Sequence, residues 1–384
     1  MKDLHKRIML GIFFALISLI PVISLIIMPK EKIVRSEIEN KTLAVFPEFN
    51  TGNILDVSFM QGFENWANDR VMGRISWIKL KNSTERLLGK TEINGVFITE
   101  ERMMQAWSGY DSEAVNKNLD AMNRFTERHS DVPVYFMLAP TALEIYRDTL
   151  PESAPVASQK DFIRHCYDYL TDITSIDVLP ALEELKDHYI YYRTDHHWNP
   201  LGAYIAYAAA TPVMGYTAAE LNRFNIESAS NSFLGTLYSK TLDSSITPDI
   251  INIYTFTESE PEVTVTVNSG NSIEEYNSLY FREALEIKNK YEIYLGLTMP
   301  IINITTDLGV SSGKKLLIFK DSFAHCLIPF LSKNFSEITV ADMRFINAGY
   351  DMFFDVNEYD SVLFIYNVIT FSEDRNLVKL NAGQ

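Results

Sequence analysis

Short apolar runs alternate with amphipathic stretches over most of this chain. Runs such as 134–138 and 315–319 are almost entirely apolar, which is typical of strands buried on both faces of a parallel sheet. The strands expected from this pattern cover 94–98, 134–138, 175–178, 189–193, 315–319, 337–341 and 361–366. Helical spacing of apolar residues predicts helices over 57–88, 111–129, 159–173, 180–187, 200–210 and 323–331. Such alternation of strands and helices predicts an α/β sheet.

The chain opens with a long apolar run. Residues 8–28 are uncharged and mostly apolar, and they follow three basic residues. A helix of that length spans a hydrocarbon core about 30 Å thick. The run ends in Met28-Pro29-Lys30, without the small-residue cleavage site of a secretory signal. We expect a single-pass membrane anchor, with the catalytic part outside the cytoplasm; a cleaved signal peptide is the alternative.

The pattern after the anchor predicts two further segments. Residues 29–115 are expected to form a tether and a helical segment that packs on the main domain. Residues 116–384 carry the α/β alternation, interrupted over about 224–305 by serine-rich turns and a V-T-V-T-V alternation. We expect this interruption to be an inserted β-rich cap.

Composition narrows the classes of function. The 384 residues carry a formal net charge of −16, and 47% of them are hydrophobic. A chain this acidic is a poor partner for nucleic acid, because duplex binding depends on basic residues that neutralise phosphates. Cys166 and Cys326 are too few for a disulfide framework, and they are either one bridge or two buried apolar residues.

One polar cluster follows the strand expected at 315–319. Lys320-Asp321-Ser322 lies where that strand ends and the helix 323–331 begins. Reactive residues of open α/β sheets gather beyond the carboxyl ends of strands, and a helix start offers free N–H groups to an oxyanion. Ser322 is therefore a candidate nucleophile. The alternative is that Asp321 or Ser322 only caps the helix.

A second cluster, Asp195-His196-His197-Trp198, follows the strand expected at 189–193. In extended chain, residues two apart share a face, so Asp195 and His197 would lie together while His196 points away. A carboxylate beside an imidazole makes a general base suited to a serine. These observations predict a Ser322, His197, Asp195 triad, if the two clusters meet. A metal site on the same residues is the weaker alternative, and we expect neither metal nor cofactor.

Several blocks of the sequence resemble one family. T-D-H-H-W-N-P-L-G-A-Y at 194–204 resembles the signature of the DHHW family of bacterial cell-surface proteins, relatives of the periplasmic alginate O-acetyltransferases within the SGNH-hydrolase-like superfamily. Further blocks that look like this family are S-E-I-E-N-K-T-L at 36–43, F-E-N-W-A-N-D-R at 63–70, F-L-G-T-L-Y-S-K at 233–240, L-L-I-F-K-D-S-F at 316–323 and I-T-V-A-D-M-R-F at 338–345.

The resemblance implies an SGNH-like three-layer α/β/α domain in which the serine follows the Asp-x-His. Lys320 stands where ordinary members of the superfamily carry the glycine of G-D-S. We expect Arg344, Asn367, Trp198 and His325 to contribute to binding, with the Ser322 N–H and Asn367 as possible oxyanion donors.

The resemblance also implies an activity and its partners. It favours an O-acetyltransferase that modifies an extracellular or cell-wall polysaccharide, supplied with acetyl groups by a membrane-bound O-acyltransferase. A carbohydrate esterase would use the same triad with water as the acceptor. A surface binding or assembly protein with a degenerate site is the third possibility, motivated by Lys320.

Overall fold

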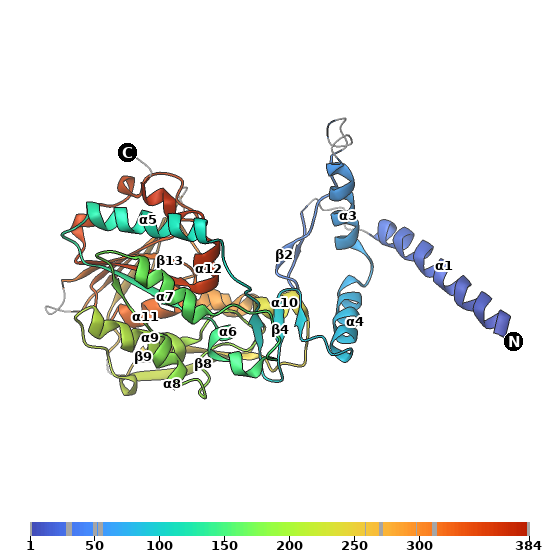
Figure 1. Cartoon of the computed structure of the whole chain (residues 1–384), viewed down its shortest axis with the longest axis horizontal. Helices are drawn as coiled ribbons and strands as arrows, with labels where there is room; N and C mark the ends of the chain where they lie inside the picture. The colour runs from blue at the N-terminus through green and yellow to red at the C-terminus, as the bar shows by residue number, and fades with distance from the viewer. Residues whose placement is uncertain are drawn as a thin grey trace. The chain divides into compact units, whose positions relative to one another are not determined.

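The computed structural model describes residues 2–27, 33–48, 52, 57–257, 259–268, 272–296, 298–308 and 313–381 (Figure 1). The chain divides into two compact units. The first comprises residues 1–93 and 239–244, and the second comprises 94–238 and 245–384. The segment expected as tether and helices, 29–115, is thus divided between the two units. Both clusters singled out in the sequence lie in the second unit.

The first unit contains mainly helices. Its elements are α1 (Lys2–Ile27), β1 (Arg35–Ser36), β2 (Lys41–Thr42), α3 (Ser58–Arg70), α4 (Arg74–Leu87) and β3 (Glu92–Ile93). One helix was expected over 57–88, and the structure has two, because Gly73 adopts a φ of +70° that interrupts the helical path. Among the described helices, none combines the length and apolar character that crossing a bilayer requires. The predicted anchor covers residues 8–28, and its last residue, Met28, lies outside the described residues.

An eight-stranded sheet forms the centre of the second unit, in the order β11-β10-β12-β14-β13-β15-β6-β7. Its parallel part consists of β14 (Glu337–Ala341), β13 (Lys315–Lys320), β15 (Ser361–Asn367), β6 (Val134–Ala139) and β7 (Thr174–Ser175). Every residue of β15 is buried, as expected for a parallel strand covered on both faces. The α/β class is confirmed.

The other three strands of the sheet come from the segment expected to form a cap. These strands are β12 (Ile301–Thr306), β10 (Val263–Asn268) and β11 (Ile273–Tyr276), and they extend the sheet in antiparallel fashion beyond β14. Separate from the sheet, β8 (Phe224–Phe233) and β9 (Asp249–Phe256) form a hairpin. Of the expected cap, β10, β11 and β12 are therefore part of the central sheet, whereas β8 and β9 are not.

Helices pack on opposite faces of this sheet. Phe319 of β13 contacts Phe125 of α5 (Ser112–Arg128) edge to face, with ring centroids 5.5 Å apart. The next residue, Lys320, bonds to His325 of α11 (Phe323–Leu331). Adjacent residues of a strand point to opposite faces, so α5 and α11 lie on opposite sides of β13.

The remaining elements connect and cover the sheet. The strands are β4 (Val96–Ile98) and β5 (Met103–Gln105), an antiparallel pair. The helices are α6 (Ala142–Ile145), α7 (Gln159–Tyr169), α8 (Leu179–Glu184), α9 (Pro200–Val213), α10 (Thr236–Thr241) and α12 (Val368–Glu373). The 3₁₀ turns are η1 (Arg147–Thr149), η2 (Leu221–Arg223), η3 (Arg282–Glu286), η4 (Lys290–Ile293), η6 (Tyr350–Met352), η7 (Val356–Glu358) and η8 (Leu377–Asn381).

The strand expected over 189–193 is absent from the described sheets. Tyr191 makes only an isolated bridge to Trp198, which closes a loop over residues 192–197. The run is apolar because Tyr191 and Tyr192 are buried in the core, and burial, not strand pairing, produced the pattern. Cys166 and Cys326 are also buried, and both are free.

Candidate active site

Ser322 lies at the junction between β13 and α11. Asp321 accepts the Phe323 N–H at 2.8 Å, so Asp321 satisfies the first turn of α11 while the Ser322 side chain makes no capping bond. Of the alternatives left open by the sequence, Asp321 is the capping residue. The Ser322 hydroxyl is therefore available to face the loop over 192–197.

The 192–197 loop is held in place at both ends. Asn199 caps α9 by accepting the N–H groups of Leu201 and Gly202, and its amide donates to the Tyr189 carbonyl at 2.6 Å. At the other end, buried Asp249 accepts the N–H groups of Arg193 and Thr194 at 2.6 and 2.8 Å. Burial raises the pKa of the Asp249 carboxyl, and these donors oppose that rise. Two well-bonded anchors thus fix the loop's conformation.

The loop brings Asp195 and His197 to Ser322. His197 Nδ1 donates to Asp195 Oδ1 at 2.6 Å, and the Ser322 hydroxyl donates to His197 Nε2 at 2.7 Å. Asp195 is 1% exposed and His197 5%, whereas Ser322 is half-buried. Because the carboxylate fixes the proton on Nδ1, Nε2 is left as an acceptor for the hydroxyl. The two clusters seen in the sequence therefore meet in space.

Asp195 stays ionised at neutral pH. Burial alone would raise the pKa of its carboxyl, but the His196 and His197 imidazoles and the Thr236 N–H outweigh burial and lower that pKa below its usual value. Thr236 supplies two donors to Asp195 Oδ2, the backbone N–H at 2.7 Å and the hydroxyl at 2.9 Å. An ionised, fully bonded carboxylate is suited to stabilise an imidazolium at His197.

Thr236 and its neighbour Gly235 were missed as site residues. A Cβ built on Gly235 would come within 2.3 Å of the Asp195 Cβ, so only glycine allows the chain to approach this closely. Both residues belong to the block F-L-G-T-L-Y-S-K, and that block was the only signal for them in the sequence.

His196 was expected to point away from Asp195 and His197, but it does not. Its ring lies beside that of His197, with centroids 3.8 Å apart, and its Nδ1 is 2.7 Å from the Thr236 hydroxyl. The expectation assumed an extended strand, in which neighbouring side chains diverge. The chain here bends continuously from Arg193 to His197, so the alternation of faces does not apply.

Tyr291 of η4 is a further residue that the sequence did not reveal. Its ring stacks on the His197 imidazole with centroids 3.7 Å apart and planes 6° from parallel. Its hydroxyl donates to the Ser322 carbonyl at 3.0 Å. Tyr291 therefore contacts both partners of the Ser322–His197 hydrogen bond. Nothing in the local pattern around this tyrosine distinguishes it from the other tyrosines of the chain.

A buried charged network lies beneath the serine. Lys320 is fully buried and donates to Asp342 at 3.0 Å and to His325 at 2.9 Å. Arg344 donates to both oxygens of Asp342, at 2.8 and 2.6 Å. Burial lowers the pKa of Lys320, and Asp342 opposes that change. Burial, and then the charge of Lys320, lowers the pKa of His325 far enough to keep it neutral.

The four residues expected to contribute to binding differ in burial and in hydrogen bonding. Trp198 is fully buried and donates to the Phe323 carbonyl, and His325 is 2% exposed, so a direct binding role is not supported for either. The Asn367 amide donates to Asp321 and Thr370, which commits both of its hydrogens and removes it as an oxyanion donor. Arg344 is paired with Asp342, although a third of its side chain is exposed. Of these four residues, Trp198, His325 and Asn367 are buried, and only Arg344 reaches solvent.

The backbone N–H of Ser322 is the oxyanion donor that remains. No hydrogen bond from this N–H to another described residue is found. It lies at the start of α11, where the helix dipole favours negative charge. Together with the nucleophile and base, it supplies the elements that acyl transfer requires.

Asp195, His196 and His197 could also offer ligands to a metal ion, since one donor atom from each lies within 4.8 Å of the others. However, His197 Nδ1 and Nε2 are bonded to Asp195 and Ser322, and both oxygens of Asp195 accept hydrogen bonds. An ion would have to break this chain of bonds. The arrangement favours proton transfer over metal binding.

The chain matches one protein-family model and is similar to several solved structures. The model of the family described as DHHW protein matches residues 107–341, more than half of the chain. A DHHW family protein from Eubacterium siraeum has 28% identity and a TM-score of 0.65, over 76% of this chain and 96% of that one. Bacillus cereus PatB1 with a sulfonyl adduct has 19% identity and a TM-score of 0.62, over 74% and 98%.

A more distant match is the O-acetyltransferase domain of Pseudomonas putida AlgJ, with 14% identity and a TM-score of 0.46, over 75% of this chain and 95% of that one. A likeness at that level decides nothing about activity. No curated protein matches in sequence. The matching region includes the Asp195–His197 loop and Ser322, and the chain belongs to the DHHW family.

Proposed function

We propose that this protein transfers an acetyl group to a hydroxyl of an extracellular or cell-wall polysaccharide, by way of an acetylated Ser322. The observation that carries the proposal is the pair of hydrogen bonds, 2.7 and 2.6 Å long, that joins Ser322 to His197 and His197 to Asp195. The chain belongs to the DHHW family, and the resemblance relates that family to the periplasmic alginate O-acetyltransferases, which supports acetyl as the group and polysaccharide as the acceptor.

The first half-reaction acylates the serine. His197 Nε2 takes the Ser322 proton while Oγ attacks the carbonyl carbon of the acetyl donor. The Ser322 N–H stabilises the oxyanion that forms, and Asp195 stabilises the imidazolium. The bond to the leaving group then breaks, and the leaving group takes the proton from His197. The products are acetyl-Ser322 and the deacylated donor.

The second half-reaction reverses these roles. His197 takes the proton of a sugar hydroxyl, whose oxygen attacks the acetyl carbonyl on Ser322. When the ester bond to Ser322 breaks, Oγ takes that proton back from His197. Half-burial of Ser322 leaves it reachable by an acceptor, while buried His197 and Asp195 are shielded from water.

The source of acetyl is part of the proposal. The resemblance favours a membrane-bound O-acyltransferase as the donor, which would place the reaction outside the cytoplasm. Both points remain predictions.

The fold of Bacillus cereus PatB1 offers a parallel, since that protein has been solved with a sulfonyl adduct. Sulfonyl reagents attach to activated nucleophiles. If Ser322 is activated as proposed, it should form an adduct of the same kind.

A carbohydrate esterase is the second candidate function, because water can replace the sugar hydroxyl without any change to the triad. A non-catalytic binding protein is less well supported than the sequence suggested. Lys320, which motivated that reading, is fully buried and paired with Asp342, so it does not obstruct Ser322.

Transfer and hydrolysis can be separated with the full-length protein. We would supply p-nitrophenyl acetate with and without an N-acetylglucosamine oligosaccharide, and quantify free acetate and acetylated sugar by mass spectrometry. The proposal predicts that acetylated sugar grows at the expense of acetate, that Ser322→Ala abolishes both, and that Ser232→Ala, an exposed serine of β8, changes neither. Acetate release unaffected by acceptor would favour the esterase.

A further inference from the structure

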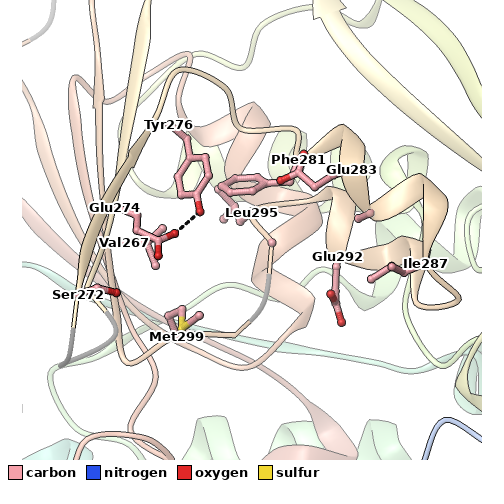
Figure 2. Close-up of a pocket in the computed structure, with 12 residues that line it drawn as sticks. Val267, Ser272, Glu274, Tyr276, Phe281, Glu283, Ile287, Glu292, Leu295 and Met299 are labelled. Carbon is pink, nitrogen blue, oxygen red and sulfur yellow. Dashed lines mark hydrogen bonds between the residues drawn. The ribbon is translucent and has the colours of Figure 1, made fainter. Parts of the chain in front are cut away.

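A hollow separate from the triad lies between β10, β11, η3 and η4, with a volume of about 480 Å³. Figure 2 shows the side chains around it. Its apolar wall includes Phe281, Leu295 and Ala284, all buried, and the Tyr276 ring lies 4.5 Å from that of Phe281. A cavity of about 300–1,000 Å³ with an apolar lining and a few polar groups is typical of small-ligand sites.

Three carboxylates surround this apolar wall. Glu274, Glu283 and Glu292 all line the hollow, and none of them takes part in an ion pair found among the described residues. Glu274 accepts the Tyr276 hydroxyl at 2.5 Å (Figure 2). Glu292 accepts the Asn289 amide at 2.8 Å. Tyr276 and Asn289 are neutral, so no described basic side chain pairs with these carboxylates. A ligand that carries positive charge is favoured there.

The hollow and the triad share one short element. Glu292 lines the hollow, and its neighbour Tyr291 stacks on His197 from the same turn, η4. The backbone of the hollow is tied to that turn as well, because the Phe281 N–H donates to the Ile293 carbonyl at 2.8 Å. The hollow and the triad therefore adjoin through η4.

We propose that this hollow is an acceptor subsite for a sugar ring bearing a free ammonium group. The C–H face of the ring would lie against Tyr276 and Phe281, and the ammonium would be held by the glutamates and attracted to the aromatic faces. This inference rests on the proposed function in taking the ligand to be a glycan. It adds that the glycan contains an amino sugar that is not N-acetylated.

The test compares two disaccharides that differ in whether their amines are acetylated, and therefore in charge. Chitobiose has two free amines, and N,N′-diacetylchitobiose has none. Binding to the full-length Ser322→Ala protein would be measured by isothermal titration calorimetry at low salt. We expect chitobiose to bind at least about fivefold more tightly than the acetylated form, and added salt to weaken its binding. Equal binding of both sugars, or no binding of chitobiose, would overturn the proposal.

Matched variants locate the binding. Glu283→Gln with Glu292→Gln removes two charges from the hollow and conserves shape, and we expect it to weaken chitobiose binding at least about fivefold. Glu286→Gln removes an exposed charge of the same turn, η3, that does not line the hollow, and it should leave binding within about twofold. An equal loss in both variants would assign the binding to the protein's net charge and overturn the proposal.

Binding in the Ser322→Ala background needs no chemistry, so the two proposals fail independently. If the serine proves unreactive while the charge-dependent binding persists, only the acetyl transfer is contradicted. If the serine reacts but chitobiose and its acetylated form bind equally, only the subsite proposal is contradicted.

Discussion

At the scale of single residues, the site depends on how completely Asp195 is bonded. One oxygen accepts from His197 Nδ1, and the other accepts from two donors of Thr236. This arrangement fixes the tautomer of His197 and keeps Nε2 unprotonated toward Ser322. A neutral amide at position 195 could present an N–H to the ring and favour the opposite tautomer.

Asp195→Asn is therefore expected to lower the rate of Ser322 acylation by about 10³- to 10⁴-fold while leaving the fold intact. The rate would be measured as the burst of p-nitrophenol from p-nitrophenyl acetate. Asp187→Asn, at an exposed aspartate outside the site, is the matched control. An Asp195→Asn protein with a burst rate close to wild type would show that His197 does not rely on this carboxylate.

At the scale of elements, three segments far apart in sequence converge on the hydrogen-bonded chain of Ser322, His197 and Asp195. They are the 192–197 loop, the turn η4 and the start of α10, each supplying one contact that the others cannot replace. The start of α10 approaches Asp195 closely, with the Thr236 N–H 2.7 Å from the carboxylate. It leaves no room for a side chain at Gly235.

Gly235→Ala should push the α10 start away from Asp195. We expect a loss of about 1–3 kcal/mol in the free energy of unfolding, together with slower acylation. Gly313→Ala is the control, because a Cβ there meets nothing within 4 Å. Urea denaturation of both variants checks the prediction, and equal stabilities would contradict it.

Two substitutions of Tyr291 separate its roles in η4. Tyr291→Phe keeps the ring on His197 and removes the bond to the Ser322 carbonyl, so we expect acylation within about fivefold of wild type. Tyr291→Leu also removes the stacked ring, and misplacement of His197 should slow acylation by about 10²-fold. Similar rates for the two variants would mean that the stacking does not position the base.

These elements also show what the sequence can predict. β13, α11 and α9 follow from local signals, namely an apolar run, a polar junction and Asn199-Pro200 at a helix start. Ser322, His197 and Asp195 could be found because they adjoin those elements. Tyr291, Thr236 and Asp249 could not, because their roles depend on contacts across long stretches of chain. For the same reason, the alternating pattern of β10 did not reveal its pairing with β12.

At the scale of the whole molecule, two buried carboxylates couple the site to stability in acid. Burial would raise the pKa values of Asp195 and Asp342. The His196 and His197 imidazoles lower the pKa of Asp195, and Arg344 and Lys320 lower that of Asp342. A carboxyl whose pKa is lower in the folded state stabilises the fold above its unfolded pKa of about 4, and this contribution is lost as the pH falls.

The free energy of unfolding should therefore fall below about pH 4. In Asp195→Asn the fall should be shallower, because one of the two groups no longer takes up a proton on unfolding. Urea denaturation of both proteins at pH 7 and pH 3 gives the comparison. An identical pH dependence would show that Asp195 has the same pKa in the folded and unfolded states.

Removal of metal provides a related test of the whole site. Because both oxygens of Asp195 and both ring nitrogens of His197 are engaged in hydrogen bonds, dialysis against a chelator should leave acylation unchanged. A loss of the burst that Zn²⁺ restores would mean that an ion, not the hydrogen-bonded chain, activates the serine.

The most direct test of the central claim is labelling of the full-length protein with a serine-directed fluorophosphonate, followed by peptide mass spectrometry. The hydrogen-bonded chain from Asp195 to Ser322 predicts one label per molecule, on Ser322, that is lost in Ser322→Ala and strongly slowed in His197→Ala. Failure of Ser322 to react, or labelling that does not depend on His197, would contradict the account.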